Sequence, residues 1–525
     1  MKWLKRLAWS ATEDVVDAPP LPDALISALD SRRYDAVKPA IRDWCIGQPE
    51  GAALEALIAA ARSRGWSAPA ELEVLEILFE YFGGDLQRAF QLVRDRSAGE
   101  HFHPDLYVLG LVALFTNNQY EDAHAFLSLG RRREPALADF ADYWMMKALV
   151  CWTANNMADL RGTVDRMCAL SPDDTTTLEN ACAMYLELGA MTEFWAARER
   201  LMHGRHRVGY AFSLNTLALG DYEEGFAQME TRYEMADAAR LINGSLFALP
   251  RWRGQDLTGK TLLITAEQGL GDTIQMARYF PLVSALPAAK VIIETQIEAL
   301  SLLQFNFPEF DFVVREHGVR PSPAFDVWEG SMSLPHIFHT TADSVPARSG
   351  YLNVPPESVE YWHRRVVELA PRRRMRIGLA WSGNPIHRAD RRRSISYACI
   401  TDFIRGIDAD VFALQTCVPP NRPSNLIDVS EEMITLADTA TLIAEMDLII
   451  SVDTSVVHLA GAIGKKTWLL LPYRYEWRWG LEGEENHWYD SVRVLRQRTH
   501  GDWDTILHEV LLERLPRYRL LQGIS

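Results

Sequence analysis

One short motif recurs along the first 240 residues: a turn, then a helix that opens on a bulky residue followed by charge and alanine. Its copies open on Tyr34, Leu86, Tyr120, Met157, Met191 and Tyr222. From Leu86 onward the copies stand roughly 31 to 37 residues apart, close to the period of about 34 residues of stacked helical hairpins. The first half of the chain is therefore expected to be helical and repetitive.

This period is that of tetratricopeptide repeats, and we expect residues 1–240 to form a tetratricopeptide-like all-α superhelix. Stacked repeats leave a concave surface suited to an extended peptide or a partner helix, so this half predicts a protein partner. The alternative is an irregular helical domain whose hairpins only resemble one another. More than one period separates Tyr34 from Leu86, which leaves the repeat count open.

Charge and cysteine usage exclude several classes of protein. The net charge of −16 disfavours nucleic acid as a partner. No apolar run approaches the ~20 residues of a bilayer span, and no signal peptide is recognisable, so we expect a cytoplasmic protein without stable membrane insertion. The basic and aromatic residues 1–10 favour an ordinary first helix over one that touches an anionic membrane. Six scattered cysteines predict reduced thiols and no zinc site.

After Arg253-Gly254 the pattern changes to short β-branched runs that alternate with helices, as in parallel sheets with crossover helices. We expect a first lobe at residues 241–355 and a second lobe at residues 356–525. The strands expected in the first lobe are 261–265, 291–294, 312–314 and 325–328, with a helix at 273–286. Those of the second lobe are 376–381, 411–415, 448–452 and 467–471, with helices at 397–406, 440–445 and 456–462.

Two such lobes place a ligand at the carboxyl ends of their strands. In the second lobe a buried strand runs into Asp453-Thr454-Ser455, and the helix that follows carries His458 one turn in. Thr454 and Ser455 can cap this helix, whose N–H groups and positive dipole end suit a phosphate. The alternative is a plain capped crossover helix.

The first lobe carries the loop Gln268-Gly269-Leu270-Gly271-Asp272 directly after its first strand. No third glycine follows, so this is not the dinucleotide fingerprint and NAD is not expected. Gly269 and Gly271 let the backbone approach a ligand, and Asp272 at a helix start keeps its charge. Asp272 is either a functional carboxylate or simply the helix cap.

The first strand of the second lobe ends at Trp381, and a third loop, Ser382-Gly383-Asn384-Pro385, leads from it to a basic cluster at 388–393 and to Ser394. One or two of these arginines, with Arg393 foremost, are expected to clamp a phosphate, and the others to be solvated. The Trp477-Arg478-Trp479 stretch with Trp488 and Tyr489 is a weaker candidate for stacking, since tryptophans commonly fill cores. Asp408-Ala-Asp410 precedes its strand, so we interpret it as a turn and expect no metal.

Taken in order, the segments EQGLGDTIQMARY, GLAWSGNP, DTA, SVDTSVVHLAGA and WRW resemble the GT-B glycosyltransferases that follow tetratricopeptide repeats in many bacterial proteins. More distantly they resemble heptosyltransferases and O-linked N-acetylglucosamine transferases. The resemblance covers residue 249 to about residue 503. It implies an α/β GT-B fold of two Rossmann-like lobes, with the acceptor on the first lobe and a nucleotide-sugar donor on the second.

The resemblance also implies roles for individual residues. Asp272 falls on the proposed general base of heptosyltransferases, and Asp453 to Ala460 fall on their donor-phosphate segment, with Ser455 where glycine is common. His458 is expected to assist as charge develops on the departing phosphate. The donor-binding set is Gly269, Gly271, Trp381, Ser382, Gly383, Asn384, Arg393, Ser394, Gln415, Asp453, Thr454, Ser455 and Arg478.

The favoured hypothesis is a metal-independent glycosyltransferase that needs no cofactor beyond its nucleotide-sugar substrate and acts on a Ser or Thr hydroxyl of a protein held by the repeats. Alphaproteobacterial flagellin glycosyltransferases look similar in architecture, which makes flagellin one candidate acceptor. Two alternatives stay open: a scaffold whose α/β part only senses a nucleotide sugar, and a transferase of lipopolysaccharide or other glycan assembly.

Overall fold

The computed structural model describes residues 20–31, 34–45, 50–67, 69–83, 85–97, 104–116, 119–130, 134–203, 208–234, 244–316, 319, 321–322, 324–371, 374–385, 390–473 and 476–522. The segment 1–10 and Arg388, both singled out from the sequence, lie outside these residues. The chain divides into two compact units, Met1–Asn156 and Met157–Ser525.

The first unit is helical throughout its described part. Three of the recurring motifs open helices there, at Tyr34, Leu86 and Tyr120. Most helices pack against helices nearby in sequence, such as α6 against α5 and α7, whereas α3 packs against α5. Tyr107 stacks on Phe126 and donates its hydroxyl to the Phe126 carbonyl at 2.9 Å. The helices are α2 (Asp23–Ser31), α3 (Tyr34–Cys45), α4 (Glu50–Ser63), α5 (Pro69–Gly83), α6 (Leu86–Ser97), α7 (Pro104–Thr116), α8 (Tyr120–Gly130), α9 (Glu134–Leu137) and α10 (Ala141–Thr153).

Five more helices begin the second unit, and the motifs at Met157, Met191 and Tyr222 again supply first helical residues. α12 packs against α13, and α14 against α15, as consecutive hairpins. The unit boundary at 156/157 falls inside the expected domain 1–240, so the last helices belong with the two sheets. The tetratricopeptide assignment stays a prediction. These helices are α11 (Met157–Leu170), α12 (Thr175–Glu187), α13 (Met191–His203), α14 (Tyr210–Ala218) and α15 (Tyr222–Met229).

The first lobe is a four-stranded parallel sheet in the order β3-β2-β1-β4. In its register Ile264 lies opposite Ile293 and Glu329. A central strand covered on both faces must be apolar, and β1 is buried from its second residue on. The elements are β1 (Thr261–Thr265), α16 (Leu270–Met276), η5 (Ala277–Tyr279), α17 (Phe280–Ser284), β2 (Lys290–Thr295), α18 (Ile297–Asn306), β3 (Asp311–Val314), β4 (Val327–Gly330), η6 (Ser331–Ser333) and α19 (Leu334–Ile337).

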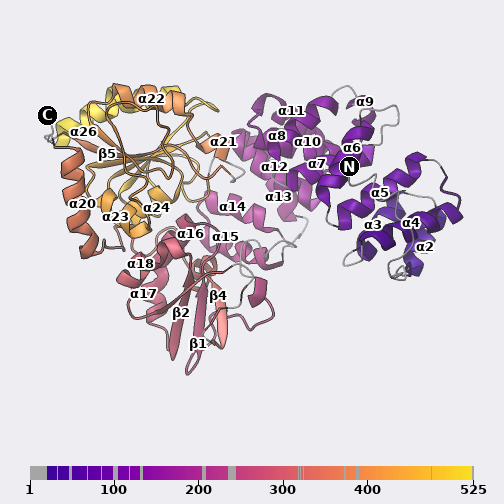
Figure 1. Ribbon diagram of the computed structural model, residues 1–525, viewed down its shortest axis with the longest axis horizontal. Helices are drawn as coiled ribbons and strands as arrows, with labels where there is room; N and C mark the ends of the chain where they lie inside the picture. Colours follow the sequence, from indigo (N-terminus) through magenta and orange to yellow (C-terminus); the bar gives the residue numbers. More distant parts are fainter. Residues whose placement is uncertain are drawn as a thin grey trace, which may run out of the picture. The chain divides into compact units, whose positions relative to one another are not determined.

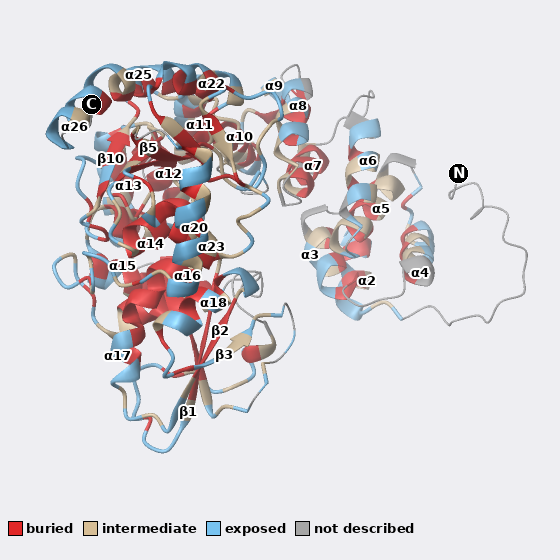
Figure 2. Cartoon of the chain, turned by 60° about the vertical axis from the view of Figure 1, so that its left-hand side comes forward, coloured by how far each residue is buried: buried red, intermediate tan, exposed pale blue. Residues whose placement is uncertain are grey.

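The second lobe is a six-stranded parallel sheet in the order β10-β9-β8-β5-β6-β7. Figure 1 shows α22 and α26 on one side of this sheet and α23 and α24 on the other. The strands are largely buried, as Figure 2 shows for both lobes. The elements are α20 (Pro356–Leu369), β5 (Arg376–Ala380), α21 (Asp390–Arg393), α22 (Tyr397–Gly406), β6 (Asp410–Ala413), β7 (Leu426–Asp428), α23 (Leu436–Ala444), β8 (Leu448–Val452), α24 (Ser455–Ala462), β9 (Thr467–Leu471), β10 (Val492–Arg496), α25 (Trp503–Glu509), η7 (Val510–Arg514) and α26 (Leu515–Gln522).

Two sheets of parallel strands with crossover helices confirm the α/β class of the second half, but several details differ from the sequence prediction. The helix expected at 440–445 begins earlier, at Leu436, because Thr435 and Asp438 form a capping box there. The single helix expected at 273–286 is broken into α16, η5 and α17, because Pro281 lacks the N–H that a continuous helix needs. The strand expected at 325–328 lies at Val327–Gly330 instead. The edge strands β7 and β10 were not expected, since each is short or interrupted by charge.

A buried ion pair ties the helical part of the second unit to its first lobe. Arg232, in the 3-10 helix η2 (Glu230–Glu234), donates Nε and Nη2 to the two carboxylate oxygens of Glu267, each at 2.8 Å. Both side chains are fully buried. Tyr233, Ser333 and Glu329 extend the hydrogen bonding around them. Because Glu267 directly precedes the loop at 268–272, this pair fixes the start of that loop.

The aromatic residues of the 477–489 segment also join the helices to the second lobe. Trp477 and Trp488 pack edge to face with Phe226 of α15, and Tyr222 lies against Trp488. Trp477, Trp479, Trp488 and Tyr489 are all buried. Burial favours the alternative that these rings fill packing contacts. Trp477 and Trp488 lie between α15 and the second lobe, whereas Trp479 and Tyr489 pack against His458.

In the part of the chain that the structure describes, no helix is both long enough and apolar enough to cross a bilayer.

Replacing Arg232 with methionine should lower the free energy of unfolding of the second unit by about 3–5 kcal/mol, because the buried Glu267 carboxylate would lose its ion-pair partner and keep only the Met332 N–H. Urea denaturation measures this loss. Arg405→Met is the matched control: Arg405 pairs with Asp402, but both side chains are largely exposed (64% and 80%), and about 0–1 kcal/mol is expected. Equal losses in the two variants would contradict the structural role of the Arg232 pair.

Gly461→Ala should destabilise the second unit by about 1–3 kcal/mol, because a methyl group at this position of α24 meets the Tyr489 ring. Gly162→Ala is the control for helix propensity. Gly162 lies in α11, a methyl group there meets no atom within 4 Å, and a gain of about 0.4–1 kcal/mol is expected. Thermal unfolding measures the change in stability of both variants. If both substitutions stabilise the chain, α24 has room for a methyl group beside Tyr489.

Candidate functional site

Two short helices meet where the lobes face each other. α16 follows the loop after β1, and α24 follows Asp453-Thr454 after β8, so each begins at the carboxyl end of a central strand. The two helices pack together, and Figures 1 and 2 place α16 between the two sheets. A Cβ on Gly271 would lie 2.8 Å from His458 Cδ2, so only glycine permits this approach. The sequence-predicted loops of both lobes are thus brought into direct contact.

Arg478 joins the two lobes through its guanidinium group. Its Nη2 is ion-paired with Asp272, Nε donates to Gln275 Oε1 at 2.6 Å, and Nη1 donates to Glu476 Oε1 at 2.6 Å. Asp272 also accepts the Gly269 N–H at 3.0 Å through its other oxygen. Asp272 therefore serves both as the cap of α16 and as the partner of a cation from the opposite lobe.

Two carboxyl groups near Arg478, those of Glu476 and Asp453, have raised pKa values. Burial raises the pKa of Glu476 to about 7, with Asp453 adding to the rise and Arg478 opposing it. Burial also raises the pKa of Asp453, although Arg393 and Arg478 oppose that shift. Burial alone would lower the pKa of Arg478, but Glu476, Asp272 and Asp453 outweigh it and raise the pKa. The cluster can hold protons near neutral pH, while Arg478 stays charged.

The loop after β5 is held by two side chains of the predicted donor-binding set. Gln415 accepts the N–H groups of Trp381 and Ser382 at 2.8 and 3.0 Å. The Ser394 hydroxyl accepts the Gly383 N–H at 2.9 Å. These bonds fix the backbone from Trp381 to Gly383, whereas the Trp381 indole lies in the hydrophobic core. Asn384 is exposed at the end of this loop.

Arg393 is the arginine of the basic cluster that contacts the segment Asp453-Thr454-Ser455. Its Nη1 donates to the Asp453 carbonyl at 2.9 Å and its Nε to Asp390 at 3.2 Å, and its guanidinium covers Gly383. Arg392 lies elsewhere: it is buried and pairs with Glu187 of α12 at 3.3 Å. Of the described cluster, Arg391 is exposed.

His458 is buried in the first turns of α24 and shares a hydrogen bond of 3.0 Å between Nδ1 and the Tyr489 hydroxyl. Burial lowers its pKa well below the ordinary value, and Arg478 and Arg278 add to this shift. His458 is therefore neutral and can help a phosphate only as a hydrogen-bond donor. The Thr454 hydroxyl accepts the Val456 N–H at 3.3 Å and caps the helix, as the sequence predicts, and Ser455 is its first residue.

Asp408 and Asp410 lie at the amino end of β6, away from the strand ends that carry the other site residues. Asp408 pairs with Arg374 and Arg519. Across the described ranges, no group of three or more His, Cys, Asp or Glu side chains is arranged to hold a metal ion.

Three residues of the site were not singled out from the sequence. Glu476 stands two residues before Arg478, and the alternation of acidic and basic residues in this loop could have indicated it. Gln275 lies one turn after Asp272 on α16. Tyr210, at the start of α14, belongs to no recognisable sequence motif. Its hydroxyl accepts a hydrogen bond from Gln268 Nε2 at 3.3 Å.

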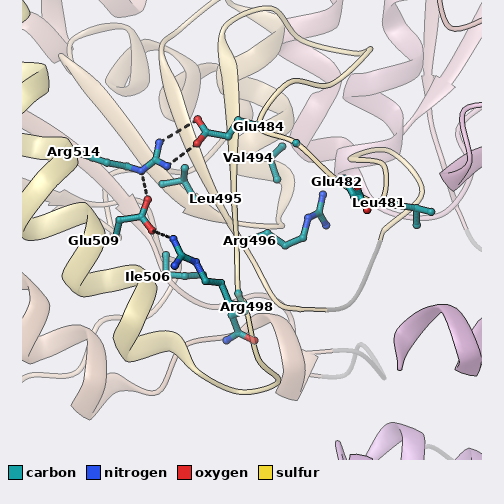
Figure 3. A pocket seen from close by; sticks show the side chains of 12 residues that line it. Leu481, Glu482, Glu484, Val494, Leu495, Arg496, Arg498, Ile506, Glu509 and Arg514 are labelled. Carbon is teal, nitrogen blue, oxygen red and sulfur yellow. Dashed lines mark hydrogen bonds and ion pairs between the residues drawn. The ribbon is translucent and has the colours of Figure 1, made fainter. Parts of the chain in front are cut away.

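A separate pocket of ≈360 Å³ lies at the carboxyl end of β10 (Figure 3). Its charged residues are largely paired with one another: Arg514 bonds Glu484 at 2.7 Å and Glu509 at 2.7 Å. Arg496 of this pocket donates Nη2 to the Trp479 and Gly480 carbonyls at 3.1 and 3.2 Å. The pocket thereby supports the segment that carries Arg478.

No protein-family model matches the chain. Among curated proteins, protein FlbA of Caulobacter vibrioides is 28% identical in an alignment of 396 residues that covers 68% of this chain. The chain spans 64% of the length of that relative.

Several solved structures that resemble the chain are glycosyltransferases. Heptosyltransferase II of E. coli, described as an ADP-heptose lipopolysaccharide heptosyltransferase, is 14% identical, with 50% of this chain and 99% of that chain covered and a TM-score of 0.36. A family 9 glycosyl transferase of Veillonella parvula is 11% identical, with 47% and 88% covered and a TM-score of 0.34. The iron-containing TibC of enterotoxigenic E. coli is 13% identical, with 48% and 67% covered and a TM-score of 0.34.

Proposed function

We propose that the chain is a glycosyltransferase that moves a sugar from a nucleotide-sugar donor to a Ser or Thr hydroxyl of a protein acceptor. The observation that carries this proposal is the contact of Asp272 with Arg478. It places a carboxylate of one parallel sheet against a cation of the other, beside the capped start of α24. Proton removal from an acceptor and charge stabilisation on a departing phosphate need these two groups close together.

In the proposed reaction the acceptor oxygen bonds to the anomeric carbon of the sugar. The bond from that carbon to the donor phosphate oxygen breaks, and the phosphate leaves with the electron pair. The hydroxyl proton passes to the Asp272 carboxylate. Glu476, 2.6 Å from the same guanidinium, is the nearby group that can take the proton onward.

The donor phosphate is proposed to lie at the start of α24. The N–H groups and positive dipole end of the helix attract an anion, and Arg393 lies against the Asp453 carbonyl. Arg478 supplies a second positive charge. Neutral His458 completes this side as a hydrogen-bond donor. The positive charge that stabilises the departing phosphate is thus proposed to come from arginines rather than from a metal ion.

The Asp272–Arg478 ion pair has to loosen before Asp272 can act as a base, because Arg478 occupies one carboxylate oxygen and the Gly269 N–H occupies the other. A diphosphate offers Arg478 an alternative anion with a geometry that guanidinium binds well. Donor binding is thus proposed to release Asp272, so that the base becomes competent only when the donor is present.

A protein acceptor is supported by the helices of the second unit, which contact both lobes beside the site. Glu187 of α12 pairs with Arg392, and Tyr210 of α14 reaches Gln268. Flagellin is the first acceptor that we propose to examine. All six cysteines are free thiols, which fits a reaction in the reducing cytoplasm.

Intact mass spectrometry of proteins from cells with and without this gene tests the function. One protein should lose a mass that equals one or more sugars when the gene is deleted, and purified chain with the matching nucleotide sugar should restore it. Loss of sugar from lipopolysaccharide alone, with every protein mass unchanged, would contradict a protein acceptor.

Asp272→Asn should lower the transfer rate by about 10²- to 10⁴-fold, the usual contribution of a general base. The amide oxygen can still accept the Gly269 N–H, so the fold and nucleotide binding should persist. Transfer kinetics and calorimetric titration with the free nucleotide measure the two properties. Asp402→Asn, at an 80% exposed carboxylate, should match the wild type in both. Transfer near the wild-type rate in D272N would remove Asp272 as the base.

Glu476→Gln should change how stability depends on pH. The native pKa of about 7 lies above the ordinary 4.5, so the folded chain keeps this proton between pH 4.5 and 7 while the unfolded chain loses it. The wild-type free energy of unfolding should therefore fall, relative to E476Q, as the pH rises through this window, by up to about 1.4 kcal/mol per pH unit. Denaturation at stepped pH measures the difference.

The matched control is Glu485→Gln, since the Glu485 side chain is 84% exposed and should show no such slope. If the difference in free energy of unfolding between wild type and E476Q stays constant from pH 4.5 to 7, Glu476 has an ordinary proton affinity.

A further inference from the structure

α14 brings a phenol from the helical part of the chain into the site between the lobes. Tyr210 is the first residue of this helix, and Gly209 before it is the cap position. The Tyr210 hydroxyl accepts a hydrogen bond from Gln268 Nε2 at 3.3 Å. Gln268 directly precedes Gly269, whose N–H donates to Asp272 at 3.0 Å. Tyr210 is therefore bonded to the loop that carries the proposed base.

Gln268 is held in an unusual conformation that directs its side chain to Tyr210. Its φ angle is +55°, in the left-handed region that side chains rarely adopt. The preceding residue, Glu267, is fixed by the buried Arg232 pair, and the following one, Gly269, by Asp272. A strained residue between two fixed neighbours persists when the surrounding structure determines its position, and such residues gather at functional sites.

The Tyr210 hydroxyl is free to donate. Its bond with Gln268 uses the oxygen as an acceptor, and among the described residues no acceptor receives its proton. Burial raises the pKa of Tyr210, and Asp272 raises it further, so the phenol keeps its proton at neutral pH. Tyr210 is half-buried, and its hydroxyl is bonded to Gln268 in the loop that carries the proposed base. An acceptor hydroxyl that approaches Asp272 has to arrive at this same loop.

Resting on the proposed function, we infer that Tyr210 is a positioning residue for the acceptor: its hydroxyl donates to the acceptor oxygen and orients it toward Asp272. The acceptor is then a hydroxyl on a polypeptide that passes along the start of α14, because this donor comes from the helical part and not from either lobe. Binding of the donor nucleotide uses Arg393 and the start of α24, and it does not involve Tyr210.

The test is Tyr210→Phe in the full chain, which removes one hydroxyl and keeps the ring. Gene-deleted cells complemented with wild type or variant report the glycosylated fraction of the acceptor, with flagellin as the first protein probed. Purified chain reports hydrolysis of a panel of nucleotide sugars without acceptor. Loss of one hydrogen bond should lower transfer by about 3- to 10-fold, raise the KM for the acceptor and leave donor hydrolysis unchanged.

Two further variants sharpen the result. Gln268→Asn tolerates the left-handed backbone but is too short to reach Tyr210, so it should lower transfer in the same direction. Tyr361→Phe is the control. It removes an exposed phenol on α20 that donates to Glu432 in the second lobe, and this variant should behave as wild type.

The outcomes separate the inference from the function. Transfer by Y210F equal to wild type at low and high acceptor concentration overturns the role of Tyr210 alone. An equal fall in hydrolysis and transfer also overturns it, since Tyr210 would then act on the donor. A wild-type chain that hydrolyses a donor but modifies no protein contradicts the proposed function, and this inference falls with it.

Discussion

The guanidinium of Arg478 holds together the only part of the described site to which both lobes contribute charged side chains. It neutralises Asp272 from the first lobe and Glu476 from its own segment, and it lies near Asp453. Without this cation, three carboxylates would meet in a half-buried region, where like charges repel strongly. The loops after β1 and β8 can approach each other, with Gly271 against His458, because Arg478 compensates their charge.

This charge balance couples the site to protons. Two arginines, Arg478 and Arg393, face the carboxylates of Asp272, Asp453 and Glu476, so a bound diphosphate would leave an excess of negative charge. The raised pKa of Asp453 and of Glu476 offers a way to reduce that excess, because either carboxyl group can take up a proton. Under the proposed function, donor binding and proton uptake would be linked, and the proton from an acceptor hydroxyl would enter a cluster that already shares protons.

Two kinds of feature could be predicted from the sequence: the central strands, from their hydrophobic runs, and the polar residues that directly follow those strands. The central strands β1, β8 and β9 lie where their β-branched runs predicted them, and Asp272, Arg393, Asp453 and Arg478 lie close together as the motif order suggested. The buried partners could not be predicted in the same way. Arg232 and Glu267 are 35 residues apart, and Glu187 and Arg392 are 205 apart. Only packing of the folded chain decides which charges meet inside a protein.

These long-range pairs show why the helices of the second unit are part of the site. α12 holds the second lobe through Glu187 and Arg392, whereas Arg232 and Tyr210 hold the loop of the first lobe. Motion of one lobe against the other must therefore strain a buried ion pair or the Tyr210–Gln268 bond. A base that is released only by the donor, and an acceptor oriented by α14, both require that the lobes keep a fixed relation. The helical attachments supply that constraint.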